Sequence, residues 1–213
     1  MRILITAGPT REPIDPVRYI SNRSSGKMGY SIAEAALENG HEVILIAGPV
    51  NWAAPAVSEF ISVESAREMY DAVAERITGC DAAVFCAAVS DYRVAKVAPE
   101  KIKKTGDHLT LVLEKTEDIL GSCRSVFRFK GVLMGFAAET GNLIANAKDK
   151  LTRKGCDFIV ANDVSRKDIG FDQDQNEVII FGADGTHKAL PIEEKRVIGK
   201  ELVKRLEAAH QNR

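Results

Sequence analysis

Short runs of branched apolar residues alternate along the chain with segments whose apolar residues recur every three or four positions. Residues 3–6 form the first such run, and residues 43–47 form the second. Between them Met28, Ile32 and Ala36 mark one face of a helix. Continuous apolar runs are typical of strands buried on both faces, whereas the wider spacing is typical of an amphipathic helix. The start of the chain therefore predicts a β-α-β unit.

The same alternation continues through most of the chain. Ser65 and Glu68 form a capping box that opens a second helix, and further helices are expected from Glu117 onward and at 142–154. The remaining predicted strands are 60–63, 82–86, 109–114, 132–136 and 158–161. Strands that alternate with helices favour a parallel sheet covered by helices on both faces. The fold class is thus α/β, a parallel-sheet three-layer sandwich.

The last fifty residues depart from this rhythm. Residues 178–181 and 188–190 flank the turn 182–185, which contains two glycines and predicts a β-hairpin. A final helix is expected near 193–208. No internal repeat divides the chain, so we expect residues 1–213 to form a single domain.

Composition narrows the choice of partners. Hydrophobic residues make up 45% and charged residues 28% of the chain, and 29 Lys and Arg nearly cancel 30 Asp and Glu. This balance gives no reason to expect nucleic acid or an anionic membrane as a partner. The four cysteines form no C-x-x-C pair, and we see no targeting segment or membrane span. We therefore expect a protein of the reducing cytosol.

In open parallel sheets ligands bind beyond the carboxyl ends of the strands, which directs attention to the loops after residues 6, 86, 136 and 161. The first loop ends in Ser24, Ser25, Gly26 and Lys27, just before a predicted helix. Free backbone N–H groups at that point favour an anion such as phosphate. The alternative is a plain serine N-cap. Neither G-x-G-x-x-G nor a P-loop is present.

Two further residues lie at strand ends. Asp91 follows the strand 82–86 and the small residues Ala87 and Ala88, so its carboxylate could meet a sugar hydroxyl or a metal-bound phosphate, or simply cap a turn. Phe136 ends the strand 132–136, where its ring could stack on a base or pack in the core.

Lysines form two candidate anion sites. Lys101, Lys103 and Lys104 lie in a segment without helical or strand periodicity, and we interpret it as a mobile basic flap that could close over polyphosphate. A solvated edge is the alternative. Lys150 and Lys154 fall on or beside the apolar stripe of the helix 142–154. They could snorkel to solvent, but their spacing favours a joint contact with an anion in the crevice.

Six motifs in order resemble the bacterial phosphopantothenoylcysteine synthetase family, also called phosphopantothenate–cysteine ligase. They are ITAGPTREP (5–13), SNRSSGKMG (21–29), AAVSDYR (87–93), PEKIKK (99–104), GFAAET (135–140) and AND (161–163). The resemblance implies a Rossmann-like homodimer that joins 4′-phosphopantothenate to L-cysteine. It also implies the use of CTP with Mg2+ or Mn2+, an acyl-cytidylate intermediate, and release of CMP and pyrophosphate. The ligands of the metal are not identified.

The resemblance also implies roles for individual residues. Asn22 resembles the amide that holds the intermediate, and Lys101 the flap lysine of the phosphoryl step. We assign Ser24, Ser25, Gly26 and Lys27, with Asn22, to substrate binding. The nucleotide-binding positions, besides Lys101, are Phe85, Cys86, Ala87, Ala88, Asp91, Glu117, Asp118, Ile119, Leu120, Phe136, Lys150 and Lys154. The family's Asn-Pro-Asp-Ile reads Thr-Glu-Asp-Ile at 116–119, so the contacts of Glu117 are the least secure.

In many bacteria this domain follows a flavin-dependent decarboxylase, so association or fusion with one is implied, but no residue here resembles that partner. We therefore expect no bound flavin and a cytoplasmic enzyme that is either free-standing or excised. Two rivals stay open. A short-chain NAD(P) reductase would use Tyr92 and Lys96, which have the Y-x-x-x-K spacing, although the glycine-rich turn is missing. The other rival is a nucleotide-sensing domain without turnover.

Overall fold

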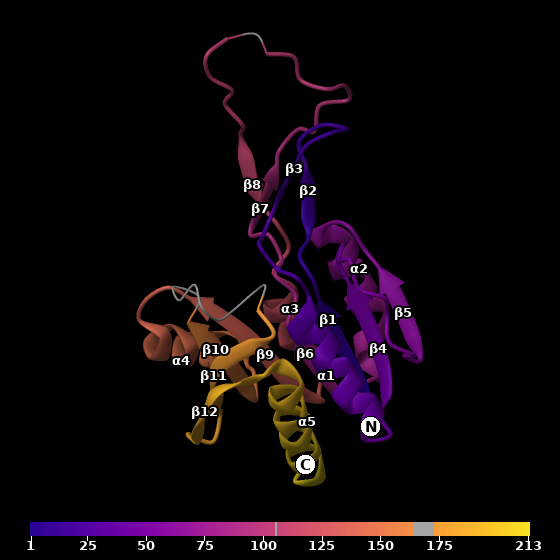
Figure 1. Cartoon of the computed structure of the whole chain (residues 1–213), viewed down its shortest axis with the longest axis vertical. Coiled ribbons are helices and arrows are strands. Elements are labelled where there is room, and N and C mark those ends of the chain that lie inside the picture. Colours follow the sequence, from indigo (N-terminus) through magenta and orange to yellow (C-terminus); the bar gives the residue numbers. More distant parts are fainter. Residues whose placement is uncertain (105, 164–172) are drawn as a thin grey trace.

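A sheet of eight strands forms the centre of the protein (Figure 1). The computed structural model describes residues 1–104, 106–163 and 173–213. In sheet order the strands are β12 (His187–Glu194), β11 (Gln175–Gly182), β10 (Phe158–Asp163), β9 (Val132–Glu139), β6 (Ala82–Phe85), β1 (Arg2–Ala7), β4 (Glu42–Ala47) and β5 (Glu59–Ser62). The strands from β10 to β5 run parallel. β11 and β12 add an antiparallel edge.

The central strands are buried on both faces, as their continuous apolar runs predict. Ile3, Leu4 and Ile5 of β1 are fully buried, and so are residues 43–46 of β4. A parallel sheet needs crossover helices, and these cover both of its faces. This explains why β1 and β4 show no alternation of polar and apolar residues.

Five helices form the outer layers. They are α1 (Lys27–Glu38), α2 (Ala66–Arg76), α3 (Ile119–Ser125), α4 (Leu143–Lys154) and α5 (Lys195–Gln211). The apolar sides of α1 and α5 pack together on one face of the sheet, and those of α2, α3 and α4 pack on the other (Figure 1). The predicted three-layer sandwich is confirmed. Half of the predicted capping box forms: Ser65 Oγ accepts the Glu68 N–H at 3.2 Å, whereas Glu68 Oε2 accepts the N–H of Glu64 at 2.7 Å rather than that of Ser65.

Two small antiparallel ribbons stand outside the main sheet. β2 (Arg11–Pro13) pairs with β3 (Tyr19–Ser21), and β7 (Tyr92–Val94) pairs with β8 (Leu113–Lys115). The chain between β7 and β8 projects far from the sheet, on the side opposite to both termini (Figure 1).

The predicted strand 109–114 is wrong in extent and in place. Only Leu113–Lys115 is a strand, and it belongs to the β7–β8 ribbon. Leu109 and Val112 are 55% and 71% exposed, because no sheet face or helix covers them. The apolar residues of this segment therefore do not indicate a strand of the central sheet.

At the end of the chain β11 and β12 pair as an antiparallel hairpin. β12 extends to Glu194, so the last helix begins at Lys195, two residues after the predicted start. Among the described residues no helix combines the length and the apolar character needed to cross a membrane.

Gly48 fixes how closely the loop after β1 approaches the end of β4. Its N–H donates to the Ala7 carbonyl at 3.0 Å. A Cβ atom at this position would lie 1.7 Å from the Pro9 carbonyl oxygen, which belongs to the backbone and cannot rotate away. We expect Gly48→Ala to lower the free energy of unfolding by about 3 kcal/mol or more, measured by urea denaturation.

Gly106→Ala is the matched control, because a Cβ atom there meets nothing within 4 Å. It should change the stability by less than about 0.5 kcal/mol. A Gly48→Ala variant as stable as this control would show that the close approach of the two backbones is not required.

Candidate functional site

Two neighbouring cavities lie at the carboxyl ends of the central strands, where ligands bind in open parallel sheets. The polar cavity has a volume of about 670 Å³, and its lining comes mainly from 115–120 and the last turns of α4. The inner cavity has a volume of about 310 Å³, and its lining comes mainly from 22–29, at the start of α1. Both are lined by Ala87, Val89, Asp91, Phe136 and Lys150. These five residues are therefore the wall through which ligands in the two cavities would meet.

The loop that enters α1 is built around a glycine and not around a serine cap. Gly26 is the N-cap residue with φ of 76° and makes no side-chain cap, while Ser24 Oγ accepts the N–H of Gly26 itself at 3.4 Å. A Cβ atom on Gly26 would lie 2.8 Å from Val50 Cγ1, so both conformation and space require glycine. The serine N-cap interpretation is wrong. The helix N-terminus faces the inner cavity without a capping side chain, which favours an anionic ligand there.

Asn22 is attached to the loop that follows β6. Its Nδ2 donates to the Ala88 carbonyl at 3.1 Å. Ala88 in turn donates its N–H to Gly8 at 2.9 Å and accepts the Thr10 N–H at 3.2 Å. The structure therefore brings the loops after β1 and β6 together and places Asn22 in the lining of the inner cavity.

Lys150 and Lys154 turn toward the polar cavity rather than to open solvent. Lys150 Nζ donates to the Phe136 carbonyl at 2.8 Å, and burial lowers the pKa of its ammonium. Lys154 pairs with Asp118, and its side chain is 11% exposed. Burying a cation without a full counter-charge is costly, so the cavity is prepared for an anion.

Asp118 has a structural task in addition to its contact with Lys154. Its Oδ1 accepts the Gly121 N–H at 2.9 Å and caps α3. Burial would raise the pKa of Asp118, but the hydrogen bonds from Lys154 and Gly121 outweigh burial and lower it. Ile119 and Leu120 follow in the first turn and line the polar cavity. The predicted group 117–120 therefore does lie at the cavity wall.

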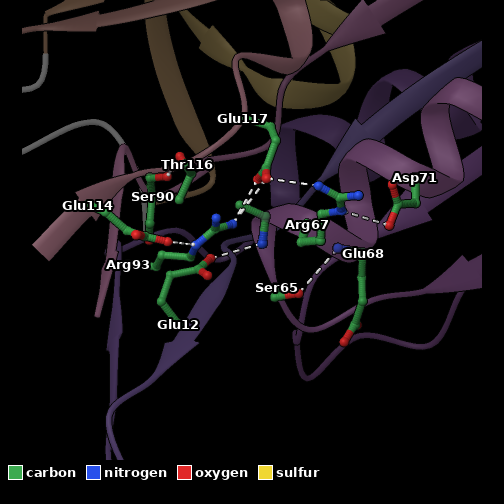
Figure 2. A network of polar contacts seen from close by, with 11 residues as sticks. Glu12, Ser65, Arg67, Glu68, Asp71, Ser90, Arg93, Glu114, Thr116 and Glu117 are labelled. Carbon is green, nitrogen blue, oxygen red and sulfur yellow. Dashed lines mark hydrogen bonds and ion pairs between the residues drawn. The ribbon is translucent and has the colours of Figure 1, made fainter. Parts of the chain in front are cut away.

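Glu117 is the centre of a polar network at the edge of the polar cavity (Figure 2). Its carboxylate accepts from Arg93 at 3.0 Å and from Arg67 of α2 at 3.1 Å. Next to it, Thr116 Oγ1 donates to the Ser90 carbonyl at 2.6 Å. The network ties α2, the β7–β8 ribbon and the start of α3 together. The side chain of Glu117 is thus engaged by protein cations, which agrees with its departure from the family motif.

Lys101 lies apart from the other predicted residues. It belongs to the projection between β7 and β8 and lines neither cavity (Figure 1). The projection is held beside Lys101, since Asp15 accepts the Ile102 N–H at 3.1 Å and Arg18 donates to the Ile102 carbonyl at 2.9 Å. Hydrogen bonds from Arg18 are the main reason that the pKa of Asp15 is strongly lowered. Mobility of the flap stays a prediction.

The reductase arrangement does not form. Tyr92 is in the strand β7 and not on a helix, and it is 48% exposed. The Y-x-x-x-K spacing of Tyr92 and Lys96 therefore does not bring the two side chains together along one helix face.

Three functional candidates were missed by the sequence patterns. Asn162, Asn176 and Lys195 are buried polar residues in the lining of the inner cavity. Asparagine is unusual in strands, and a lysine is unfavourable in the first turn of a helix. Those two departures were the available signals, but Asn162 and Lys195 lie 33 positions apart in the sequence (195 − 162), and only the fold shows that the three meet.

We expect Glu117→Ala to lower the free energy of unfolding by about 1–3 kcal/mol, because two arginines lose a largely buried partner. Burial raises the pKa of Glu117, but hydrogen bonds from its own N–H, Arg67 and Arg93 outweigh burial and lower it. The stabilisation is therefore present at neutral pH and diminishes as the pH falls below about 4. Urea denaturation at the two pH values measures the difference.

Asp71→Ala is the matched control, since Asp71 also pairs with Arg67 but its side chain is 53% exposed. It should change the stability by less than about 0.5 kcal/mol. Equal losses in both variants would show that burial of Glu117 does not matter.

The family model for the C-terminal domain of DNA/pantothenate metabolism flavoproteins matches residues 1–209. The chain is 45% identical over 207 residues to the coenzyme A biosynthesis bifunctional protein CoaBC of Vibrio vulnificus (strain CMCP6), covering 96% of the chain and 51% of that protein. It is 47% identical over 206 residues to CoaBC of Escherichia coli (strain K12), covering 95% and 50%. The chain thus spans about half the length of these relatives.

A crystal structure of the C-terminal domain of a coenzyme A biosynthesis bifunctional protein CoaBC superposes with a TM-score of 0.85 at 40% identity. The match covers 100% of this chain and 96% of the other. The Rossmann-like layered fold expected from the sequence is therefore that of a solved relative. The chain belongs to the family of DNA/pantothenate metabolism flavoprotein C-terminal domains.

Proposed function

We propose that this chain is the phosphopantothenate–cysteine ligase of coenzyme A biosynthesis. It joins 4′-phosphopantothenate to L-cysteine with CTP through an acyl-cytidylate and gives 4′-phosphopantothenoylcysteine, CMP and pyrophosphate. The observation that carries the proposal is the pair of cavities that share Asp91, Phe136 and Lys150. One cavity is lined by lysines and the other by a helix N-terminus, so two anionic substrates can meet at one wall. The names of the relatives, which place them in coenzyme A biosynthesis, support it.

The polar cavity is the proposed CTP site. The ammonium groups of Lys150 and Lys154 face it and would neutralise the triphosphate. Phe136 is proposed to stack on the base, and Asp91 to contact the sugar or a metal-bound phosphate. Phe85, Ala87 and residues 117–120 complete the lining of this cavity, whereas Cys86 and Ala88, which were also predicted to bind the nucleotide, line only the inner cavity. The preference for CTP over other triphosphates comes from the family resemblance.

The inner cavity is the proposed site of 4′-phosphopantothenate. Its phosphate would bind at the uncapped start of α1, beside Ser24, Ser25, Gly26 and Lys27. Asn22 would hold the intermediate, since its carboxamide already reaches Ala88, which lies between Ala87 and Val89 of the shared wall. With its phosphate at the start of α1, the substrate would extend toward the shared wall. Its carboxylate would then lie near Asp91 and Lys150, beside the proposed CTP site.

A divalent cation, Mg2+ or Mn2+, is proposed to accompany CTP. Within the described residues no three His, Cys, Asp or Glu side chains gather as a site for a metal ion. Asp91, Glu139 and Asp149 line the polar cavity singly and offer hard oxygen donors. Mg2+ is commonly held by one or two carboxylates together with substrate phosphates, so these residues fit a cation that enters with the nucleotide. When bound, it would offset charge on the triphosphate.

The proposed reaction needs positioning and charge rather than a protein nucleophile. A carboxylate oxygen of 4′-phosphopantothenate attacks the α-phosphorus of CTP, and the bond to pyrophosphate breaks. The amine of cysteine then attacks the acyl carbon. The new C–N bond forms, the C–O bond to CMP breaks, and the amine proton passes to solvent. Lys150, at the shared wall, is placed to stabilise charge in the first step.

Residues 1–213 would act as one ligase domain in a cytoplasmic homodimer. Association or fusion with a phosphopantothenoylcysteine decarboxylase is proposed as well, because the relatives are named bifunctional proteins. Flavin is assigned to that partner and not to this chain. A purified chain that carries stoichiometric FMN would contradict this assignment.

Release of pyrophosphate tests the function. We expect the release to require both 4′-phosphopantothenate and CTP, and to become catalytic when L-cysteine is added. In competition, CTP should be used in preference to ATP and UTP. Catalytic release that depends on neither acid nor amine would contradict the ligase, and a rise in melting temperature with NADPH but not with CTP would favour a reductase.

Lys101→Gln should lower kcat far more than the affinity for CTP, if the lysine serves the transition state. Because Lys101 lies outside both cavities, its contact with the nucleotide needs either a movement of the projection or a second copy of the chain. Steady-state kinetics with CTP as the varied substrate measure the two effects. Lys103→Gln, in the same projection, is the control and should retain the parent kcat. Equal losses of kcat and of affinity would assign Lys101 to ground-state binding.

A further inference from the structure

Three buried polar side chains form one end of the inner cavity, and the proposed function gives them no role. Asn162 comes from β10, Asn176 from β11 and Lys195 from the start of α5. They are 8%, 3% and 5% exposed, respectively. Buried polar groups cost free energy unless they are satisfied, so this cluster calls for a physical account.

Lys195 carries a buried positive charge in an unfavourable place. It is the first residue of a helix of 17 residues, whose N-cap Glu194 makes no side-chain cap and whose first turn contains no acid. Its Nζ donates to the Gln173 carbonyl at 2.6 Å, and its N–H donates to the Asp174 carbonyl at 3.0 Å. Asp174 is already within its electrostatic reach, since the pKa of that carboxyl is lowered mainly by Lys27 and in smaller part by Lys195. The ammonium and the positive end of the helix dipole favour a further anion in the cavity.

Asn162 contributes a hydrogen-bond acceptor to the cluster. Its side-chain oxygen is buried and accepts no hydrogen bond from any described residue. A carbonyl oxygen can be satisfied only by a donor. Asn176 Oδ1 accepts the Glu177 N–H at 3.0 Å, so the NH2 group is what Asn176 can offer to a ligand. One end of the cavity therefore presents a cation and an amide donor next to an acceptor.

The cluster lies close to the place where the proposed intermediate forms. Burial raises the pKa of the Cys86 thiol to about 12, and the positive charge of Lys195 opposes this rise. Cys86 lines the same cavity and is two residues before Ala88, whose carbonyl binds Asn22. Lys195 and Cys86 thus line the same cavity, and Cys86 directly precedes Ala87 of the shared wall.

We propose that Lys195, Asn176 and Asn162 form the subsite of the incoming amino acid. The ammonium of Lys195 and the amide N–H of Asn176 bind its α-carboxylate, and Asn162 Oδ1 accepts a hydrogen bond from its amine. A zwitterion matches this pattern, whereas a phosphate offers no donor to Asn162. The proposal rests on the proposed ligase function and names the residues that select its second substrate.

The decisive experiment compares L-cysteine with cysteamine, the same aminothiol without a carboxylate. In the parent protein kcat/KM should be higher for cysteine. In Lys195→Met we expect kcat/KM for cysteine to fall by about 10- to 100-fold, the usual effect of removing a hydrogen bond to a charged group. The value for cysteamine should stay within about twofold, and so should the KM values for CTP and 4′-phosphopantothenate.

Lys200→Met is the matched control on the same helix. Its side chain is 47% exposed and pairs with Glu38 at 3.0 Å, away from the cavity. Both amines should react at the parent rates in this variant. Lys195→Arg keeps the charge and should retain most of the preference for cysteine.

Equal losses with both amines in Lys195→Met, or a parent protein that does not discriminate between them, would overturn the subsite. A parent protein that releases no pyrophosphate with either amine would overturn the ligase proposal as well. If Lys195→Met does not fold, Asn162→Leu keeps a similar volume without the buried oxygen. It should raise the KM for both amines and leave the KM for CTP unchanged, and an unchanged KM for the amines would count against the proposal.

Discussion

Burial of a parallel sheet on both faces is the constraint on which the rest of this structure depends. Because β1, β6, β9 and β10 run in the same direction, their carboxyl ends meet at one edge of the sheet. Loops that are far apart in the sequence must then share a small space. The hydrogen bonds of Ala88 to Gly8 and Thr10 join two of these loops, and Asn22 extends the junction to the start of α1. The two cavities therefore result from the parallel direction of these strands, which brings their loops to one edge of the sheet.

The buried positive charges at this edge of the sheet oppose the stability of the fold. The chain has a formal net charge of −1, yet five lysines line the two cavities, namely Lys27, Lys115, Lys150, Lys154 and Lys195. Burial lowers the pKa of Lys150, and Lys195 is a cation at the positive end of a helix. Such arrangements cost stability unless an anion offsets them. The same charges are those that would strengthen a complex with anionic substrates.

Much of the fold and part of the candidate site could be predicted from the sequence, because the local pattern of apolar residues reflects which residues are buried. Continuous apolar runs identified the central strands, and the position of Lys150 on an apolar stripe indicated that it faces the crevice. The errors have a common cause. Residues 109–114 are rich in apolar residues like a strand, but no partner face covers them. Gly26, and not a serine, is the N-cap of α1, in a left-handed conformation where Val50 of a distant loop leaves no room for a side chain. Asn162, Asn176 and Lys195 converge only through the order of strands in the sheet.

The shared wall between the cavities also suggests why a site of this kind needs few reactive side chains. The proposed reaction transfers a nucleotidyl group to the carboxylate and then the acyl group to the amine, so the nucleotide and the amine must each reach the same carboxyl group of the acid. Asp91, Phe136 and Lys150 border both cavities, while Lys154 borders only the polar one and Lys195 only the inner one. Anions held at the two far ends would point their reacting groups at the same wall. Positioning by separated charges can thus replace a protein nucleophile, since holding the reactants in place lowers the barrier by itself.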